Sequence, residues 1–267
     1  MTRLISEWIA EMEEKAAAWN EELITDFGAG YVEIASAVSG KSIVEINEAA
    51  TEHKVAVIPI TCGQGTIEFF SESVAAIVRA MGFDAFVTKA SDVNGIYEAH
   101  TAGADIIFMA DDDRYIALNL KNGKIGDNNI ATGRGFAEML SRLAGDLKEK
   151  ETVVLGYGII GKIMADYFSK KGAVITVFDK NNEKKEEVLK DGYKWMDDIE
   201  GIGKFRYVAD GTSEGGWLSE SMLSGDALIA APGIPLSLDE SSAEKLKGRY
   251  VHDLLEIGTA VMLGLAL

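Results

Sequence analysis

The sequence predicts an α/β protein with a helical N-terminal segment and two domains, each built around a parallel sheet. Residues 1 to about 50 show only helical periodicity. From Lys54 onward, short apolar segments alternate with helical ones, and this alternation starts again after Glu151. Strands that alternate with helices form parallel sheets covered on both faces. A chain of 267 residues is long enough for about two domains.

The N-terminal segment carries an amphipathic stripe, in which apolar residues recur at three- and four-residue spacing. The stripe consists of Leu4, Ile5, Trp8, Ile9, Met12, Ala16, Trp19 and Leu23. Gly28 and Gly30 end this helix, and shorter helices are expected near 31–38 and 42–50.

The first α/β segment has short apolar runs and helical runs in alternation. Strands are expected at 54–60, 83–88 and 104–110, and helices at 66–82, 92–103 and 131–147. Between 110 and 131 lie an acidic loop, the short apolar stretch YIALNL and a turn rich in Gly and Asn. We therefore expect an N-terminal helical segment at 1–53 and a small α/β substrate domain at 54–148.

The second α/β segment repeats this pattern. Apolar runs at 152–156, 173–179, 205–209, 226–231 and 249–253 predict another parallel sheet. This domain is expected at 149–250. Residues 251–267 end its last strand and then form an apolar helix that packs back against the first domain.

Composition excludes several classes of function. The chain has 43 acidic and 26 basic side chains and a net charge of -17, which disfavours nucleic-acid binding. One cysteine, Cys62, permits no disulfide within the chain, and three scattered histidines predict no metal site. The N-terminus lacks a signal-peptide pattern, and no apolar run approaches the roughly 20 residues of a membrane span. We expect a cytoplasmic protein without membrane contact; apolar helices at both ends are compatible with a homodimer.

The most informative local motif is a glycine loop between a predicted strand and a predicted helix. Its residues are Gly156, Tyr157, Gly158, Ile159, Ile160 and Gly161, a GxGxxG pattern. The first glycine permits a tight turn, the second lets a pyrophosphate approach the backbone, and the third allows close helix–strand packing. A pyrophosphate then lies at a helix N-terminus, where free N–H groups favour anions. The pattern predicts a Rossmann-type dinucleotide site.

The choice of dinucleotide depends on Asp179, which ends the next predicted strand, 18 residues after Gly161. An acid at about this spacing binds the ribose hydroxyls and repels a 2′-phosphate, which favours NAD, although Lys180 follows directly. Two later strand ends face the same crevice, at 209–216 with Thr212 and at 230–235 with Ala231, Pro232 and Gly233. The prolines there either end the strand or form a rigid lip under the nicotinamide.

Three features of the first domain fall at or after predicted strand ends and are candidates for substrate binding. One is the loop 59–65 and the helix after it, with Phe70, Ser71 and Glu72. The second is Ala110 with Asp111, Asp112 and Asp113, and the third is the segment 119–133, which begins at Asn119 and contains Asn128. The aspartates form either a solvated capping loop or an anchor for a substrate ammonium. They lack the longer ligand run of a Ca²⁺ loop.

Other reactive side chains are better explained by structure. Cys62 has no histidine nearby in sequence, and lone cysteines are usually small apolar residues. His100 falls in a predicted helix and His252 in a predicted strand. Composition and periodicity thus indicate an NAD-dependent oxidoreductase acting on a small, cationic molecule.

Several segments resemble the PylD family, the dehydrogenases of pyrrolysine biosynthesis. They are FFSES (69–73), GFDAFVT (82–88), DVNGIYEA (92–99), FMADDD (108–113), NLKNGKI (119–125), APGIP (231–235) and IGTA (257–260). The resemblance is dense over 54–170 and looser over 205–267. It implies oxidation by NAD⁺ of the terminal amine of 3-methyl-D-ornithine joined to the ε-amine of L-lysine. Attack by the ornithine α-amine and loss of ammonia then give pyrrolysine.

The resemblance also implies roles for individual residues. Leu4 and Phe70 line the pocket for the apolar stems, and the N-terminal helix serves as a wall or lid. We hypothesise that Asp111 holds a substrate ammonium, with Asn128 and Phe70 completing the pocket. Asp111 and Asp112 are general-base candidates if burial raises their pKa.

Two alternatives remain open at this point. One is an amino-acid or amine dehydrogenase with a different substrate, for which Lys121 and Lys124 lie in a suitable glycine-rich setting. The other is a non-catalytic NAD sensor, which would need an output surface such as a basic patch.

Overall fold

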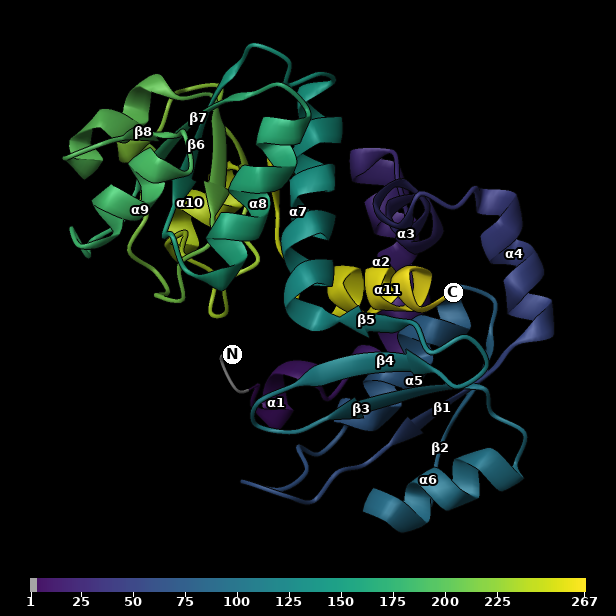
Figure 1. Cartoon of the computed structure of the whole chain (residues 1–267). Helices are drawn as coiled ribbons and strands as arrows, with labels where there is room; N and C mark the ends of the chain where they lie inside the picture. The colour runs from purple at the N-terminus through teal and green to yellow at the C-terminus, as the bar shows by residue number, and fades with distance from the viewer. Residues whose placement is uncertain (1–3) are drawn as a thin grey trace. The chain divides into compact units, whose positions relative to one another are not determined.

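The computed structural model of the protein describes residues 4–267, which divide into two compact units (Figure 1). Unit 1 comprises the chain up to Gly135 together with Leu254–Leu267, and unit 2 comprises Phe136–Asp253. The expected boundary near residue 148 differs from this division. The chain passes from one unit to the other inside helix α7 (Asn128–Ala144), which begins in unit 1 and ends in unit 2.

Unit 1 combines helices from both ends of the chain with a five-stranded sheet. Its helices are α1 (Ser6–Ile9), α2 (Met12–Phe27), α3 (Tyr31–Ser39), α4 (Ile43–Glu52), α5 (Phe70–Ala80), α6 (Asp92–Thr101) and α11 (Glu256–Ala266). Its strands are β1 (Lys54–Ile58), β2 (Asp84–Val87), β3 (Ile106–Ala110), β4 (Tyr115–Asn119) and β5 (Ile125–Asp127).

The N-terminal stripe is divided between two helices. α1 ends at Ile9 and α2 begins at Met12, so the expected single helix is interrupted. The buried members of the stripe are Leu4, Ile9, Met12 and Ala16. Ile5 and Trp8 keep 46% and 39% of their surface exposed, because a helix of one turn cannot direct every apolar residue inward.

The sheet of unit 1 has the order β2-β1-β3-β4-β5. β2, β1 and β3 are parallel, as predicted, whereas β4 and β5 are antiparallel additions. The reason is the length of the connection after β3, which consists of Asp111–Arg114 alone. A connection this short permits a hairpin, whereas a parallel neighbour needs a crossover of about a dozen residues. The stretch YIALNL is therefore a strand of a mixed sheet.

Helix α11 is buried in unit 1, where it packs against α3, β5 and α5. Close approach depends on two glycines. A Cβ on Gly126 would lie 2.1 Å from the Met262 carbonyl oxygen, and one on Gly264 would lie 3.1 Å from the Ala35 Cβ. The apolar side of α11 is thus covered by its own chain, and this helix gives no support to a homodimer.

Unit 2 is built on a six-stranded parallel sheet of order β11-β10-β9-β6-β7-β8. Its strands are β6 (Glu151–Leu155), β7 (Val174–Phe178), β8 (Lys194–Trp195), β9 (Tyr207–Asp210), β10 (Leu228–Ala230) and β11 (Tyr250–Val251). Its other elements are helices α8 (Ile159–Lys170), α9 (Lys184–Lys190) and α10 (Glu240–Lys245) and the 3₁₀ turns η1 (Ile199–Lys204) and η2 (Glu220–Met222). Its core includes Val153, Leu155, Val208 and Ile229. The strand order of this sheet is that of the Rossmann fold.

Residues 4–267 were considered for membrane spans and metal sites because both bear on function. No helix there is long and apolar enough to cross a membrane. No group of three or more His, Cys, Asp or Glu side chains within that range is arranged to hold a metal ion.

Candidate active site

The glycine loop of unit 2 follows β6 and leads into α8, as its spacing predicts. Gly156 has φ +79°, a left-handed conformation that favours glycine. A Cβ on Gly161 would lie 1.9 Å from the Gly156 carbonyl oxygen, so this position excludes any side chain. A Cβ on Gly158 would have no atom within 4 Å. The loop therefore packs tightly at its third glycine and is open above its second, at the amino end of α8.

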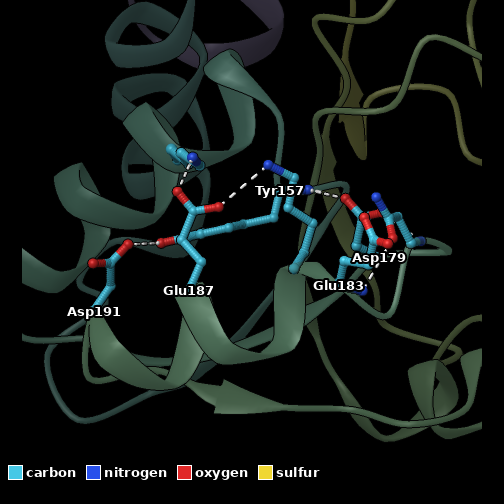
Figure 2. Close-up of polar contacts among 8 residues, drawn as sticks. Tyr157, Asp179, Glu183, Glu187 and Asp191 are labelled. Carbon is cyan, nitrogen blue, oxygen red and sulfur yellow. Dashed lines mark hydrogen bonds and ion pairs between the residues drawn. The ribbon is translucent and has the colours of Figure 1, made fainter.

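Tyr157 contributes its backbone to the loop, while its side chain serves the packing of unit 2 (Figure 2). The ring is buried, and its hydroxyl donates to Asp191 Oδ2 at 2.7 Å. Lys162 Nζ lies over the ring, 5.5 Å from its centroid, and pairs with Glu187. Burial, followed by Asp191, raises the pKa of Tyr157, so the phenol remains protonated. We conclude that this side chain ties the glycine loop to the residue that follows α9.

Asp179 closes the loop from the end of β7. Its Oδ2 accepts a hydrogen bond of 2.6 Å from the backbone N–H of Tyr157, and its Oδ1 accepts one of 2.8 Å from Asn181 (Figure 2). The predicted ribose-binding acid is thus held against the glycine loop. The first exposed side chain of α8, Ile159, lies beside this loop with 65% of its surface exposed, and Ile160 is half-buried.

The loops after β9 and β10 approach each other closely beside the glycine loop. A Cβ on Gly233 would lie 1.9 Å from the Thr212 carbonyl oxygen, and one on Gly156 would lie 3.1 Å from Thr212 Cγ2. Thr212 is held by Asp210, whose Oδ1 accepts from the Thr212 backbone N–H at 2.9 Å and from its hydroxyl at 2.6 Å. Burial raises the pKa of Asp210. Thr212 and Gly233 therefore lie at one edge with the glycine loop.

Ala231 and Pro232 begin the last of these loops. Ala231 is buried and Pro232 is half-buried. The Ala231 carbonyl oxygen lies 2.8 Å from Nδ1 of His252, which follows β11. Burial lowers the pKa of His252, so the ring is neutral near pH 7 and Nδ1 carries the donated hydrogen. His252 therefore fixes the loop backbone, in agreement with a structural interpretation of this residue.

In unit 1, the loops at the carboxyl ends of β1, β2 and β3 are held together by carboxylates. Asp92 accepts from the Thr61 backbone N–H at 2.8 Å and from the Thr61 hydroxyl at 2.6 Å. Asp112 Oδ2 accepts from the Gln64 backbone N–H at 2.8 Å. A Cβ on Gly63, which has φ +68°, would lie 2.2 Å from that oxygen. Asp112 thus anchors the loop after β1.

Asp111 divides its two oxygens between structure and solvent. Oδ1 accepts from the backbone N–H groups of Arg114 at 2.7 Å and Asp113 at 2.9 Å, which forms the β3–β4 turn. Among the residues that the structure describes, Oδ2 contacts Cys62 Sγ at 3.9 Å and no backbone donor. The N–H groups of Arg114 and Asp113 lower the pKa of this exposed carboxyl. The condition under which Asp111 would be a base, a pKa raised by burial, is not met.

Phe70 and Tyr115 form the apolar part of the same region. Their rings meet edge to face, with centroids 5.3 Å apart. The hydroxyl of Tyr115 lies 2.8 Å from that of Thr259 on α11, and burial raises its pKa. Phe70 is half-buried at the start of α5, next to the buried Ser71 and the half-buried Glu72. Leu4 is buried two residues before α1, which contacts α5, and Ala110 ends β3 half-buried.

Asn128 lies at the same edge of the sheet as Asp111. β5 pairs with β4 so that Asp127 is opposite Ile116, while Ala110 is opposite Tyr115. The half-buried Asn128 begins α7, and its Oδ1 accepts from the Thr132 hydroxyl at 3.2 Å. The structure therefore brings together the region of Phe70, Asp111 and Asn128.

Asn119 is the predicted substrate residue that the structure removes from this region. β4 runs antiparallel to β3, so Asn119 is opposite Ile106, at the other edge of the sheet. It is completely buried, its Nδ2 donates to the Ala266 carbonyl oxygen at 3.1 Å, and its Oδ1 accepts from the backbone N–H groups of Lys121 and Asn122. Asn119 thus holds the end of α11, and its assignment to the substrate site is wrong.

The two candidate lysines lie at that same far edge. Lys121 pairs with Asp105, which lies directly before β3. Lys124 Nζ donates to the Leu267 carbonyl oxygen at 3.0 Å. Cys62 does lie at the near edge, but burial of the sulfur and the neighbouring Asp111 raise the pKa of its thiol. A raised pKa disfavours the thiolate, which argues against a nucleophilic role.

Comparison with known proteins adds the family. Residues 9–126 match the N-terminal domain model of the pyrrolysine biosynthesis protein PylD. The chain is 37% identical over 210 residues to the pyrrolysine synthase of Methanosarcina acetivorans, which covers 79% of this chain and 81% of that protein. It is 36% identical over 215 residues to the pyrrolysine synthase of Methanosarcina barkeri, and this match covers 80% of this chain and 81% of that protein. The chain belongs to the pyrrolysine synthase (PylD) family. The resemblance of its motifs to this family is thereby confirmed.

Solved structures of other enzymes share the fold. Methylenetetrahydrofolate dehydrogenase/cyclohydrolase from Campylobacter jejuni aligns over 94% of both chains with a TM-score of 0.55 and 14% identity. Shikimate dehydrogenase from Aquifex aeolicus aligns over 80% of this chain and 90% of that one, with a TM-score of 0.51 and 16% identity. This PylD-family chain therefore has the α/β fold of Rossmann-type dehydrogenases, as the sequence predicts.

Three residues that hold the loops of this PylD-family chain lie outside its recognisable sequence motifs or have distant partners. Asp92 fixes the first loop, Arg114 Nη1 donates to Asp127 Oδ2 at 3.1 Å, and Asp210 holds Thr212. Asp210 directly follows the predicted strand at 205–209 and precedes Thr212 by two residues, which is a local signal that could have identified it. Asp92 and Arg114 act on partners 31 and 13 residues away, and no spacing rule predicts such pairs.

Proposed function

We propose that this protein catalyses the last step of pyrrolysine biosynthesis as a cytoplasmic, NAD-dependent oxidoreductase. The substrate is 3-methyl-D-ornithyl-Nε-L-lysine, and its terminal amine is oxidised. The observation that carries this proposal is the glycine loop, which is open at Gly158 and hydrogen-bonded to Asp179, in a chain 37% identical to a pyrrolysine synthase. The loop supports the type of reaction, and the family supports the substrate.

The residues of unit 2 fit a nicotinamide dinucleotide. The open space above Gly158 and the first turn of α8, which has no side-chain cap, suit a pyrophosphate. Asp179 would accept hydrogen bonds from the ribose hydroxyls, and Thr212, Ala231, Pro232 and Gly233 would line the nicotinamide end. A carboxylate at the ribose repels a 2′-phosphate, which supports NAD over NADP. When bound, NAD⁺ supplies the two-electron oxidation by accepting a hydride.

The residues of unit 1 fit the amine side of the substrate. Asp111 is exposed and its pKa is lowered, and its Oδ2 accepts from no backbone donor among the described residues, so it would hold a substrate ammonium. Phe70 would contact the apolar stem of the substrate, together with Leu4 and Ala110. Asn128 offers an amide at the same edge, and α1 would form a wall that excludes water. Ser71 and Glu72 lie beside Phe70, where Glu72 adds negative charge.

The reaction balances without a further reactant. The reacting carbon loses a hydride and its amine a proton, which leaves an imine; the ornithine α-amine adds to that carbon, and ammonia leaves as the ring C=N forms. The reacting amine must be uncharged before the hydride departs. Asp111 is a weak base because its pKa is lowered, and Tyr115 is buried with a raised pKa. We therefore infer that water removes the proton from the reacting amine. Positioning of the substrate then accounts for most of the rate.

A dehydrogenase for free amino acids is less well supported. That alternative needs a lysine at the substrate site, and both Lys121 and Lys124 pair at the opposite edge of the sheet. A non-catalytic sensor is also disfavoured, since a net charge of -17 offers no basic surface. A possible homodimer stays a prediction.

A substrate panel tests this proposal. The purified full chain would be incubated with NAD⁺ and, separately, with 3-methyl-D-ornithyl-Nε-L-lysine, ornithine, lysine or alanine, and NADH would be followed by its absorbance. We expect NADH with the ornithyl-lysine amide alone. NADH with a free amino acid would support the alternative, and bound NAD⁺ without any turnover would support the sensor.

A further inference from the structure

An ion pair joins the loops after β7 and β9 in unit 2. Lys180, directly after Asp179, pairs through Nζ with Glu214 Oε1 in the loop that follows Thr212. β6 lies between β7 and β9 in the sheet, so the pair connects the two loops that flank the glycine loop. The lysine and glutamate side chains are 75% and 59% exposed. Both side chains are therefore largely open to solvent, on the two loops that flank the glycine loop.

Lys180 is the cation nearest in sequence to the acid that would bind the ribose. A cation at this place is the usual means of accepting the 2′-phosphate that distinguishes NADP from NAD. Asp179 offers a phosphate no hydrogen-bond donor, because its carboxylate oxygens accept from the backbone of Tyr157 and Asn181. Whether a phosphate finds a partner here thus depends on where the ammonium group of Lys180 is directed.

The lysines at the start of α9 are paired elsewhere. Among the residues that the structure describes, Lys184 pairs with Glu187 and Lys185 with Asp197. Glu187 also pairs with Lys162 from α8 (Figure 2). Glu214 is therefore the carboxylate that decides the availability of Lys180, the lysine next to Asp179.

We infer that Glu214 is a specificity-determining residue, which pairs with Lys180 and so withholds this cation from the 2′-phosphate of NADP. This inference rests on the proposed dinucleotide site of unit 2. It extends that proposal from Asp179 to a residue 35 positions further along the chain, which no spacing rule of the glycine motif includes.

The test is cofactor binding to the full chain, measured by isothermal titration calorimetry with NAD⁺ and with NADP⁺. In Glu214→Gln, Lys180 is released, and we expect the NADP⁺ dissociation constant to fall by about fivefold, the size of one exposed charge pair. The constant for NAD⁺ should stay within about twofold. The gain should shrink at high salt, because exposed charges are screened.

Two controls separate the pair from a general effect of charge. Lys180→Met combined with Glu214→Gln should abolish the gain, since no cation remains. Glu220→Gln removes the same charge from another exposed pair of unit 2, with Lys245, and should leave both constants unchanged. An unchanged NADP⁺ dissociation constant in Glu214→Gln, or a gain in NADP⁺ affinity that persists without Lys180, would overturn this inference and leave the proposed function standing. If the parent chain binds neither dinucleotide, the proposed function falls with it.

Discussion

The carboxyl edges of the two sheets are built from different chemistry. In unit 2, the loops meet through glycines at contacts that a side chain would block, such as Gly161 against Gly156 and Gly233 against Thr212. In unit 1, the loops are joined by carboxylates that accept backbone N–H groups, such as Asp92 on Thr61. The edge of unit 2, the glycine edge, presents backbone and the amino end of a helix. The edge of unit 1, the carboxylate edge, presents negative side chains.

This difference indicates which ligand each edge suits. Backbone N–H groups at a helix N-terminus attract anions such as a pyrophosphate. Exposed carboxylates with lowered pKa values, such as Asp111, attract ammonium groups over the whole neutral range. A dinucleotide and an amine are the two ligands of the proposed reaction, so the contrast between the edges is its central physical argument.

The strongest test of the glycine edge compares two glycines of one loop. Gly161→Ala places a methyl group 1.9 Å from a carbonyl oxygen, and we expect it to cost about 2 kcal/mol and to lower the melting temperature markedly. Gly158→Ala meets no atom within 4 Å, so it should fold normally but bind NAD⁺ about tenfold more weakly. Circular dichroism and calorimetry measure the two effects. If Gly158→Ala binds NAD⁺ like the parent, the pyrophosphate does not lie there.

The test of the carboxylate edge is Asp111→Asn. The amide oxygen can still accept the two turn N–H groups, so the loop should be kept while the charge is lost. We expect the substrate KM to rise by about 30-fold, the equivalent of one charged hydrogen bond, with kcat changed much less. Asp113→Asn, two residues away and exposed, is the matched control and should leave KM unchanged. An unchanged KM in Asp111→Asn would remove this residue from the site.

The sequence indicated more of the edge in unit 2 than of the edge in unit 1, for a physical reason. The glycine loop, its strand and Asp179 are specified by local spacing, because the turn needs small residues at fixed positions. Asn119 was misassigned because its partner, Ala266, is 147 residues away. The residues of a family motif such as NLKNGKI can serve the packing of the fold or the binding of a ligand, and the motif alone does not say which. The antiparallel β4 was predictable from the short loop before it.

Asn119→Ala tests this correction of the carboxylate edge. The change removes three hydrogen bonds of a completely buried side chain, and we expect a loss of about 2 kcal/mol and a fall in melting temperature of several degrees. KM should stay at the parent value when activity is measured below the melting transition. A raised KM with normal stability would return Asn119 to the substrate site.

The smallest expected effect concerns His252 in unit 2. Burial lowers its pKa, so the unfolded chain binds a proton more readily than the folded one. Stability should therefore decrease as the pH falls below about 6.5, the ordinary pKa of histidine. His252→Asn keeps a donor for the Ala231 carbonyl oxygen but does not titrate. Melting temperatures at about pH 5.5 and pH 7.5 should differ less in this variant than in the parent; an equal difference would assign the effect to other groups.

We propose that the two edges serve one reaction, which oxidises an amine and closes a ring. The most direct measurement is the stoichiometry of a reaction of the full chain with NAD⁺ and 3-methyl-D-ornithyl-Nε-L-lysine. NADH is read by absorbance, ammonia by an enzymatic assay, and pyrrolysine by mass spectrometry. We predict equal amounts of all three products. NADH without pyrrolysine, or no NADH although NAD⁺ binds, would contradict the claim.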